Sequence, residues 1–98
     1  GITGMAAKER KAIASGDVRS HPHYLAAVDA VRSEIAVPME ASGKLVGVID
    51  VQSTEPEAYG EYDQLLLQLL ASRMAYAVEN AILFERAERQ NELLQRLA

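Results

Sequence analysis

The sequence contains no cysteine among its 98 residues. This absence excludes disulfide bonds, metal sites built on thiolates and a cysteine nucleophile. The chain also lacks the roughly 18-residue apolar run of a membrane span, and residues 1–4 lack the charged and apolar regions of a secretory signal. We therefore expect a soluble, cytoplasmic protein without membrane attachment.

Basic residues are few as well. The ten Lys and Arg are outnumbered by 14 Asp and Glu, and the formal net charge of −4 argues against a nucleic-acid surface. No glycine-rich phosphate loop is present, because Gly43 and Gly47 belong to a predicted strand pair. The chain is 49% apolar and 24% charged, which is typical of one soluble globular domain rather than of a disordered segment.

The middle of the chain predicts a β-hairpin around which the domain is built. Its strands cover residues 34–40 and 44–52, and Gly43 in the turn between them can adopt a positive φ. The second strand has apolar side chains on both faces, so it needs cover on both sides and neighbours on both edges. Pro38 cannot donate a ladder hydrogen bond and is expected near a sheet edge or an irregularity.

The first thirty residues predict only short elements, because their apolar runs are brief and are interrupted by glycine and proline. An amphipathic spacing of i, i+4 and i+7 connects Tyr24, Val28 and Val31. We expect a helix over 4–10 with Thr3 as its N-cap, an edge strand within 12–18, a loop over 19–23 and a short helix over 24–31.

Residues 61–97 predict a single long helix. No glycine or proline interrupts this segment, Gly60 can act as the N-cap, and Glu61 and Asp63 suit the positive end of the helix dipole. At 1.5 Å per residue the helix is about 55 Å long. Residues 65–84 are apolar on more than one face, and a sheet can cover only one of them. We expect the same helix of a second copy to cover the other face.

A heptad reading of this helix defines the predicted dimer seam. Seam positions alternate by four and three residues, and most of them are apolar. Polar residues at Arg73 and Asn80 are expected to set the register between paired helices rather than to bind a ligand. The predicted seam consists of Leu66, Leu69, Arg73, Tyr76, Asn80, Leu83, Ala87, Leu94 and Leu97.

Few side chains are arranged for chemistry. His21 and His23 flank a proline in a predicted loop without a third ligand nearby, so we expect no metal and no cofactor. Asp50 lies in an apolar strand, where it must face a polar pocket or find a donor. Arg32, Ser33 and Glu34 cluster at a strand entry. These three residues are suited to contact a ligand, and they are equally suited to form a surface ion pair or turn hydrogen bonds.

An ordered set of short segments resembles a GAF domain, the small-molecule-sensing module of signalling proteins. The resemblance implies an α+β fold related to PAS domains, with an antiparallel sheet, helices on both faces and a ligand pocket between the sheet and the short helices. It also implies a long terminal helix that leads to an output domain. The matching segments are residues 1–4, 17–18, 22–24, 32–38 and 43–50, followed by Tyr59, Asp63 and residues 77–81.

This resemblance also implies which residues face the pocket and how much of the domain is present. Residues 1–60 correspond to part of the sheet with short helices and residues 61–98 to the signalling helix, within one domain. The usual first helix and first two strands are absent, so the strand 44–52 is expected to leave an exposed edge that a second copy can pair. The pocket candidates are Thr3, His23, Tyr24, Arg32, Glu34 and Asp50.

Two family patterns are not matched. In the cyclic-nucleotide subgroup an Asn-Lys pair, a Phe and an Asp-Glu pair recur, whereas here Gly43 precedes Lys44, Tyr59 is the aromatic residue and Gln64 follows Asp63. The methionine sulfoxide reductases of the family work through cysteines, which this chain lacks. We therefore expect a non-enzymatic regulatory module that binds an unidentified small molecule, dimerises and relays a signal along its terminal helix. The alternative is a structural dimerisation element without a functional pocket.

Overall fold

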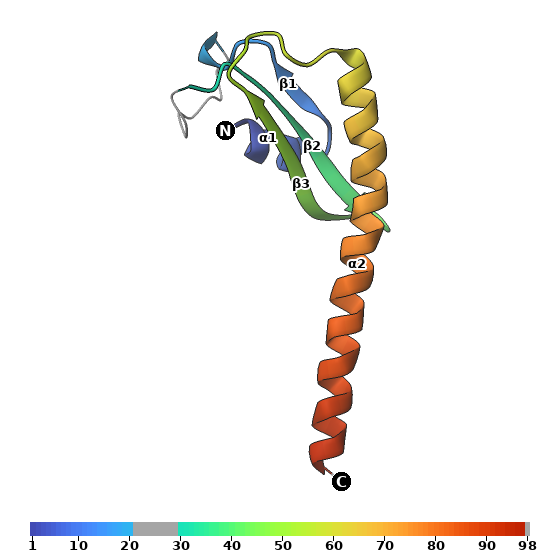
Figure 1. Cartoon of the computed structure of the whole chain (residues 1–98). Coiled ribbons are helices and arrows are strands. Elements are labelled where there is room, and N and C mark those ends of the chain that lie inside the picture. Colours follow the sequence, from blue (N-terminus) through green and yellow to red (C-terminus); the bar gives the residue numbers. More distant parts are fainter. Residues whose placement is uncertain (21–29, 98) are drawn as a thin grey trace.

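Three strands form one antiparallel sheet in the first half of the chain (Figure 1). The computed structural model describes residues 1–20 and 30–97. The strands are β1 (Ile13–Ser15), β2 (Ser33–Ala41) and β3 (Lys44–Ser53), and β2 lies between the other two. Together with a short first helix and a long last one, this sheet confirms the predicted α+β class.

The hairpin of β2 and β3 is confirmed, and its strands are slightly longer than predicted. Ser42 and Gly43 form the turn with φ values of 53° and 75°, and two consecutive positive φ angles match the right-handed twist of the strands that they join. Pro38 lies beyond the residues paired with β1, directly before a register irregularity between Met39 and Glu40. Its predicted position near an edge or irregularity is therefore also confirmed.

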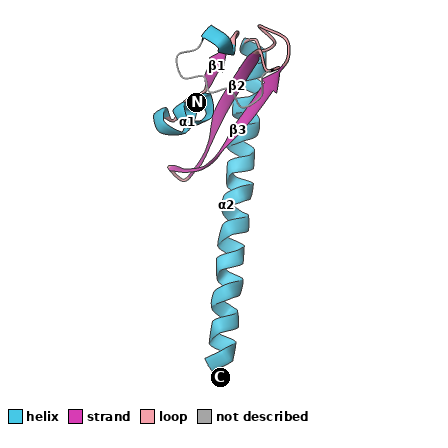
Figure 2. Cartoon of the chain, turned by 90° about the vertical axis from the view of Figure 1, so that its left-hand side faces the viewer, coloured by secondary structure: helices cyan, strands magenta, loops and turns pink. Residues whose placement is uncertain are grey.

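The two faces of the sheet are covered by different helices. α1 (Ile2–Glu9) packs on one face and α2 (Glu61–Leu97) on the other, as Figures 1 and 2 show. Alternation along β2 sends Ala36 toward α1 and Ile35 and Val37 toward α2. The buried clusters are Ile2, Ala6, Val18, Val31 and Ala36 on the α1 face, and Ile35, Val37 and Ala71 on the α2 face.

α2 begins where the sequence predicts. Gly60 N–H donates to Asp63 Oδ2 at 2.8 Å, and Gly60 O accepts from Gln64 N–H at 3.1 Å. These two bonds satisfy backbone groups that a helix start leaves open. Ala71 and Ala75 are buried against the sheet, and the helix then continues far past the hairpin turn (Figure 1). The molecule consequently measures 60 × 26 × 21 Å.

The start of the chain differs from the prediction. α1 begins at Ile2 with Gly1 as its N-cap, so the prediction of Thr3 as N-cap is wrong. Ile2 and Ala6 lie one helical turn apart and both contact the core, and this packing sets the helix start two residues earlier than predicted. The helix ends at Glu9, and its C-cap Arg10 has a left-handed φ of 58°.

The segment after α1 is only partly as predicted. Of the strand expected within 12–18, only residues 13–15 pair with β2. Arg19 lies in a short 3₁₀ helix, η1 (Val18–Ser20), so the predicted loop over 19–23 is wrong at its start. The reason is local, because Asp17 Oδ1 accepts a hydrogen bond from Arg19 N–H at 3.1 Å. Of the helix predicted over 24–31, residues 30 and 31 are not helical and the others lie outside the described residues.

β3 forms one edge of the sheet. It pairs with β2 along its whole length, and no further strand lies beside it among residues 1–20 and 30–97. The edge of β3 therefore carries a row of backbone groups that can accept another strand.

Within residues 1–20 and 30–97, no helix is long and apolar enough to cross a membrane.

Candidate functional site

Two carboxylates and one amide meet on the α1 face of the sheet. Glu34 in β2 pairs with Gln52 in β3, and Asp50 lies two residues before Gln52 on the same face. Gln52 Nε2 donates to Glu34 Oε2 at 3.2 Å and to Asp50 Oδ2 at 3.0 Å. The amide therefore holds the two carboxylates in one polar cluster, which we call the acidic cluster.

Glu34 is the buried member of the acidic cluster, with 7% of the residue exposed. The pKa of its carboxyl is raised from 4.5 to about 7, first by burial and then by the hydrogen bond and negative charge of Asp50, while the Gln52 amide acts in the opposite direction. Near neutral pH the Glu34 carboxyl therefore exists in both its protonated and its ionised form. A positively charged group placed between the carboxylates would replace this proton.

Arg32 points to a different partner. Its Nη2 lies 3.2 Å from Asp17 Oδ2, and the pKa of Asp17 is lowered by the Arg19 backbone bond and then by the Arg32 side chain. The backbone of Arg32 is bonded on both sides, since its N–H donates to Ser53 O and its carbonyl accepts from Val18 N–H, each at 2.8 Å. The ion pair thus fixes the entry to β2 beside the acidic cluster rather than within it.

The loop between β3 and α2 is tied to this same entry. Ser33 is fully buried, and its Oγ donates to Glu55 O at 2.6 Å. Glu57 adopts a φ of 55°, and its N–H donates to Gly16 O at 2.8 Å. The Glu57 carboxylate lies close to the Cα of Gly16, where a larger side chain would require Glu57 to adopt another rotamer. The loop that starts α2 is therefore anchored next to the acidic cluster.

The predicted pocket residues divide into four groups. Glu34 and Asp50 are brought together, whereas Arg32 is paired with Asp17 outside their cluster. The side chain of Thr3 is exposed on α1, where Ile2 and Ala6 instead face the sheet. The predicted contributions of His23 and Tyr24 lie outside the described residues.

Sequence reasoning missed Gln52 and Asp17. A signal for Gln52 was available, because strand alternation places it on the same face as Asp50. No local pattern connects Asp17 with Arg32, which lies 15 residues later. In the described part of the chain, no group of three or more His, Cys, Asp or Glu side chains gathers that could hold a metal ion.

α2 presents its predicted seam to solvent. Its sheet-facing side carries the buried Ala71 and Ala75, and all nine seam residues are exposed, among them Leu69 at 67% and Leu83 at 53%. Large apolar residues are exposed elsewhere on the helix as well, including Phe84 at 66%. An apolar surface of this kind is typical of a helix that packs against a further element.

Comparison with known proteins identifies the family. Residues 1–79 match the family described as the GAF domain. Protein YtsP of Bacillus subtilis is 32% identical over 78 residues, which cover 80% of this chain and 48% of that protein.

Solved structures share the fold. The type II free methionine-R-sulfoxide reductase of Thermoplasma acidophilum superposes with a TM-score of 0.78 at 32% identity, covering 82% of this chain and 57% of that chain. The GAF domain of a phosphoenolpyruvate-protein phosphotransferase from Coxiella burnetii superposes with a TM-score of 0.80 at 20% identity, covering 88% of this chain and 54% of that chain. This chain thus spans about half the length of the relatives that it matches.

Proposed function

The chain belongs to the GAF domain family, and we propose that it is a regulatory module that senses a small molecule on one face of its sheet and relays the signal through α2. The observation that carries this proposal is the acidic cluster. A buried carboxylate beside a second carboxylate is costly unless a proton or a cationic group neutralises it. Carboxyl groups with strongly shifted pKa values cluster at functional sites, so the acidic cluster is the best candidate for a ligand contact.

The chemistry of the cluster favours a ligand with a primary ammonium. An ammonium has three donors and no acceptor, and the two carboxylates of Glu34 and Asp50 offer acceptors that Gln52 Nε2 holds in place. The reductase of Thermoplasma acidophilum is named for free methionine-R-sulfoxide, which is an amino acid. This relative supports free amino acids and their derivatives as the ligand class.

We propose binding without catalysis. Reduction of a sulfoxide through thiols needs a cysteine, and the sequence has none. The residues of the acidic cluster can hold a cation and move a proton, and they provide no nucleophile activated by a base. The module is accordingly a sensor whose bound ligand acts through conformation.

The relay uses the anchored loop and α2. Ser33 adjoins Glu34 in β2, and its bond to Glu55 O connects the site to the loop that starts the helix. A ligand that shifts the position of β2 can favour one packing of α2 over another. A modest difference in ligand affinity between the two packings is enough to bias their populations. A second copy paired along the exposed seam would carry the change to a covalently linked output domain.

A thermal-shift and calorimetric screen tests the ligand proposal. The panel contains amino acids including methionine sulfoxide, their N-acetylated forms and simple carboxylates, measured at pH 7.5. A specific ligand at 100 times its Kd should add about 2.7 kcal/mol to the free energy of unfolding. We expect a free amino acid to bind, its N-acetylated form to lose binding, and Glu34→Gln to weaken it at least tenfold.

The exposed variant Glu88→Gln is the matched control, because it removes one carboxylate from α2 far from the sheet. It should bind like the unmodified chain. A uniform lack of binding across the panel would favour the second candidate function, a purely structural dimerisation element. That candidate is supported by the exposed apolar residues of the seam.

Light scattering tests the dimer, which both candidates require. At micromolar concentration we expect twice the chain mass. The double variant Leu69→Glu/Leu83→Glu should give the single mass, because two carboxylates on each helix would face each other across the seam. Gln95→Glu, at an exposed position of α2 outside the seam, should leave the dimer intact. A single mass for the unmodified chain would overturn the paired relay.

A further inference from the structure

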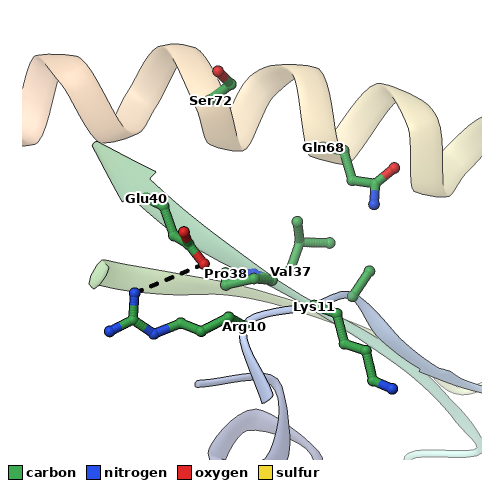
Figure 3. A pocket seen from close by; sticks show the side chains of 8 residues that line it. Arg10, Lys11, Val37, Pro38, Glu40, Gln68 and Ser72 are labelled. Atoms are coloured by element: carbon green, nitrogen blue, oxygen red, sulfur yellow. Dashed lines mark ion pairs between the residues drawn. The ribbon is translucent and has the colours of Figure 1, made fainter. Parts of the chain in front are cut away.

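Two grooves lie between the sheet and α2, and their rims differ in charge. In the groove of Figure 3, Arg10 Nη1 lies 3.8 Å from Glu40 Oε1. The second cation on that rim is paired as well, because Lys11 Nζ lies 3.3 Å from Glu9 Oε2. The other groove encloses about 290 Å³, and we call it the hairpin groove. It is lined by residues 44–46 of β3 and by Glu79, Ile82, Leu83 and Arg86 of α2.

The apolar side chains of the hairpin groove are accessible. Leu45 and Val46 in β3 are half-buried, and Ile82 and Leu83 in α2 are 38% and 53% exposed. The groove is continuous with the predicted dimer seam, because Leu83 belongs to both. A second copy that packs along the seam therefore also meets the hairpin groove.

The rim of the hairpin groove carries unpaired positive charge. Neither Lys44 nor Arg86 forms an ion pair within residues 1–20 and 30–97. The carboxylate of Glu79 is engaged elsewhere, since its Oε2 accepts a hydrogen bond from Ser42 Oγ at 3.4 Å and connects the hairpin turn to α2. Ammonium and guanidinium groups attract the face of an aromatic ring, so this rim favours an aromatic occupant.

The seam itself indicates how two copies would be oriented. In the heptad notation abcdefg, the seam holds the a and d positions, with Asn80 at a and Leu83 at d. An asparagine at an a position is typical of parallel helices, where it meets its own copy and fixes the register. We therefore place the two copies side by side with their helices running in the same direction.

This arrangement brings one aromatic residue of the second copy to the hairpin groove. In a parallel pair, a g position faces an e position of the partner about five residues further along the helix. Glu79 and Arg86 directly precede seam residues and are therefore g positions. The residue opposite Glu79 is the partner's Phe84, at an e position, and this side chain is 66% exposed in the single chain.

We propose that Phe84 of each copy inserts into the hairpin groove of the other copy, where its ring packs on Leu45 and Leu83 beside Lys44 and Arg86. This inference rests on the proposed dimer and adds the end of the hairpin to its interface. A symmetric pair uses the same surface on both copies, so the contact occurs twice. It connects β3 of one copy directly to α2 of the other.

Cross-linking tests the contact, and the chain has no cysteine of its own to interfere. Chains with Leu45→Cys and chains with Phe84→Cys are co-expressed with tags of different mass and treated with a short bismaleimide. We expect a covalent dimer of mixed tags on a denaturing gel. In the matched control, Asn91→Cys replaces Phe84→Cys. Position 91 has the same heptad letter and lies about 10 Å further along α2, so we expect at least fivefold less mixed product.

Analytical ultracentrifugation gives an independent measurement without cysteines. Phe84→Ala should raise the dissociation constant of the dimer at least tenfold, because the ring no longer fills the groove. Met74→Ala removes an apolar side chain that is 46% exposed on α2 outside the seam, and it should leave the dissociation constant unchanged. Circular dichroism checks that both variants are folded.

Two results would overturn this contact while the proposed dimer stands. One is a dimeric chain in which Phe84→Cys gives no more mixed product than Asn91→Cys. The other is a dimer that Phe84→Ala and Met74→Ala weaken to the same extent. A single mass for the unmodified chain at micromolar concentration would overturn both the contact and the dimer on which it rests.

Discussion

The two faces of the sheet are built from the same strand and differ in what they bury. Residues of β2 that point toward α2, such as Ile35 and Val37, enter a wholly apolar cluster. Those that point toward α1 alternate between the apolar Ala36 and the charged Glu34, both buried. A strand that needed only stability would not bury a carboxylate. Both faces therefore contribute an apolar cluster to the core, and only the α1 face adds a buried carboxylate to it.

The strongest way to test this division is to weaken the α2 face. Ile35 is 1% exposed, and Ile35→Ala should lower the free energy of unfolding by about 4 kcal/mol, because it removes buried carbon and leaves a cavity. Urea denaturation measures the change. Ile82→Ala, at a position 38% exposed on α2, should cost less than about 1 kcal/mol. Equal losses at the two positions would contradict the assignment of the core.

On the α1 face, we expect a substitution of Glu34 to raise the free energy of unfolding rather than to lower it. The pKa of Glu34 is raised from 4.5 to about 7 in the folded chain, so the stability associated with its protonated form is complete below pH 4.5 and is lost as pH rises through 7. Glu34→Gln has no carboxyl to ionise. At pH 8 it should be more stable than the unmodified chain by as much as about 3 kcal/mol, and near pH 4.5 the difference should vanish.

Denaturation midpoints measured at pH 4.5, 6, 7 and 8 check this prediction. The exposed Glu88→Gln should follow the unmodified chain at every pH, because its carboxylate is solvated. If Glu34→Gln destabilises the fold equally at pH 4.5 and pH 8, then Glu34 is a structural hydrogen-bond partner rather than a titrating site. The contrast between the two faces would then be lost.

The hydrogen bond that connects β2 to the loop before α2 should contribute less to the free energy of unfolding. Ser33→Ala removes the bond from Ser33 Oγ to Glu55 O and leaves that carbonyl without this donor, which should cost about 1 to 1.5 kcal/mol. Hydrogen exchange should show faster opening of the loop 54–60 with little change at β1. Thr54→Ala, at an exposed position of the same loop, is the control. Unchanged exchange in the Ser33 variant would remove this bond from the relay.

The part of α2 beyond the sheet belongs to neither face and should give the smallest effect. Arg89 Nη2 is paired with Glu85 Oε1 one helical turn away, and both side chains are mostly exposed. Glu85→Gln should therefore cost only about 0.3 to 0.5 kcal/mol, and less at high salt. Helical ellipticity at low and high salt measures it. A loss above about 1 kcal/mol would show that the tail is stabilised by more than helix-surface charge pairs.

The sequence predicted well those elements whose signals are local and long. Alternating apolar residues with a glycine turn identified the hairpin, and an uninterrupted helical segment identified α2 within a residue of its observed bounds. For Asp50 the sequence indicated that a carboxylate in an apolar strand must face a polar pocket or find a donor, and Gln52 Nε2 is such a donor. The role of Glu34 and Asp50 as pocket residues stays a prediction. Those predictions used the chain's own chemistry and needed no contact between distant segments.

The predictions that failed depended on packing between distant segments. Thr3 is a good capping residue, but contact of Ile2 with the core decides where α1 begins. The pairing of Arg32 with Asp17 and the close approach of Glu57 to Gly16 exist only once the strands have assembled. The groove lined by residues from 10–12, 37–40 and 68–72 likewise combines three distant segments, and no short motif identifies such a combination.

The length of α2 past its buried alanines makes it a lever. About 33 Å of helix extend from Ala75 to Leu97, so a tilt of about 10° at the sheet would carry the free end sideways by about 6 Å, more than one helical turn's rise. Rearrangements near the sheet that are no larger than a side-chain shift would thus arrive at the far end as displacements comparable to half a helix diameter. A small adjustment at either face would be multiplied by geometry alone.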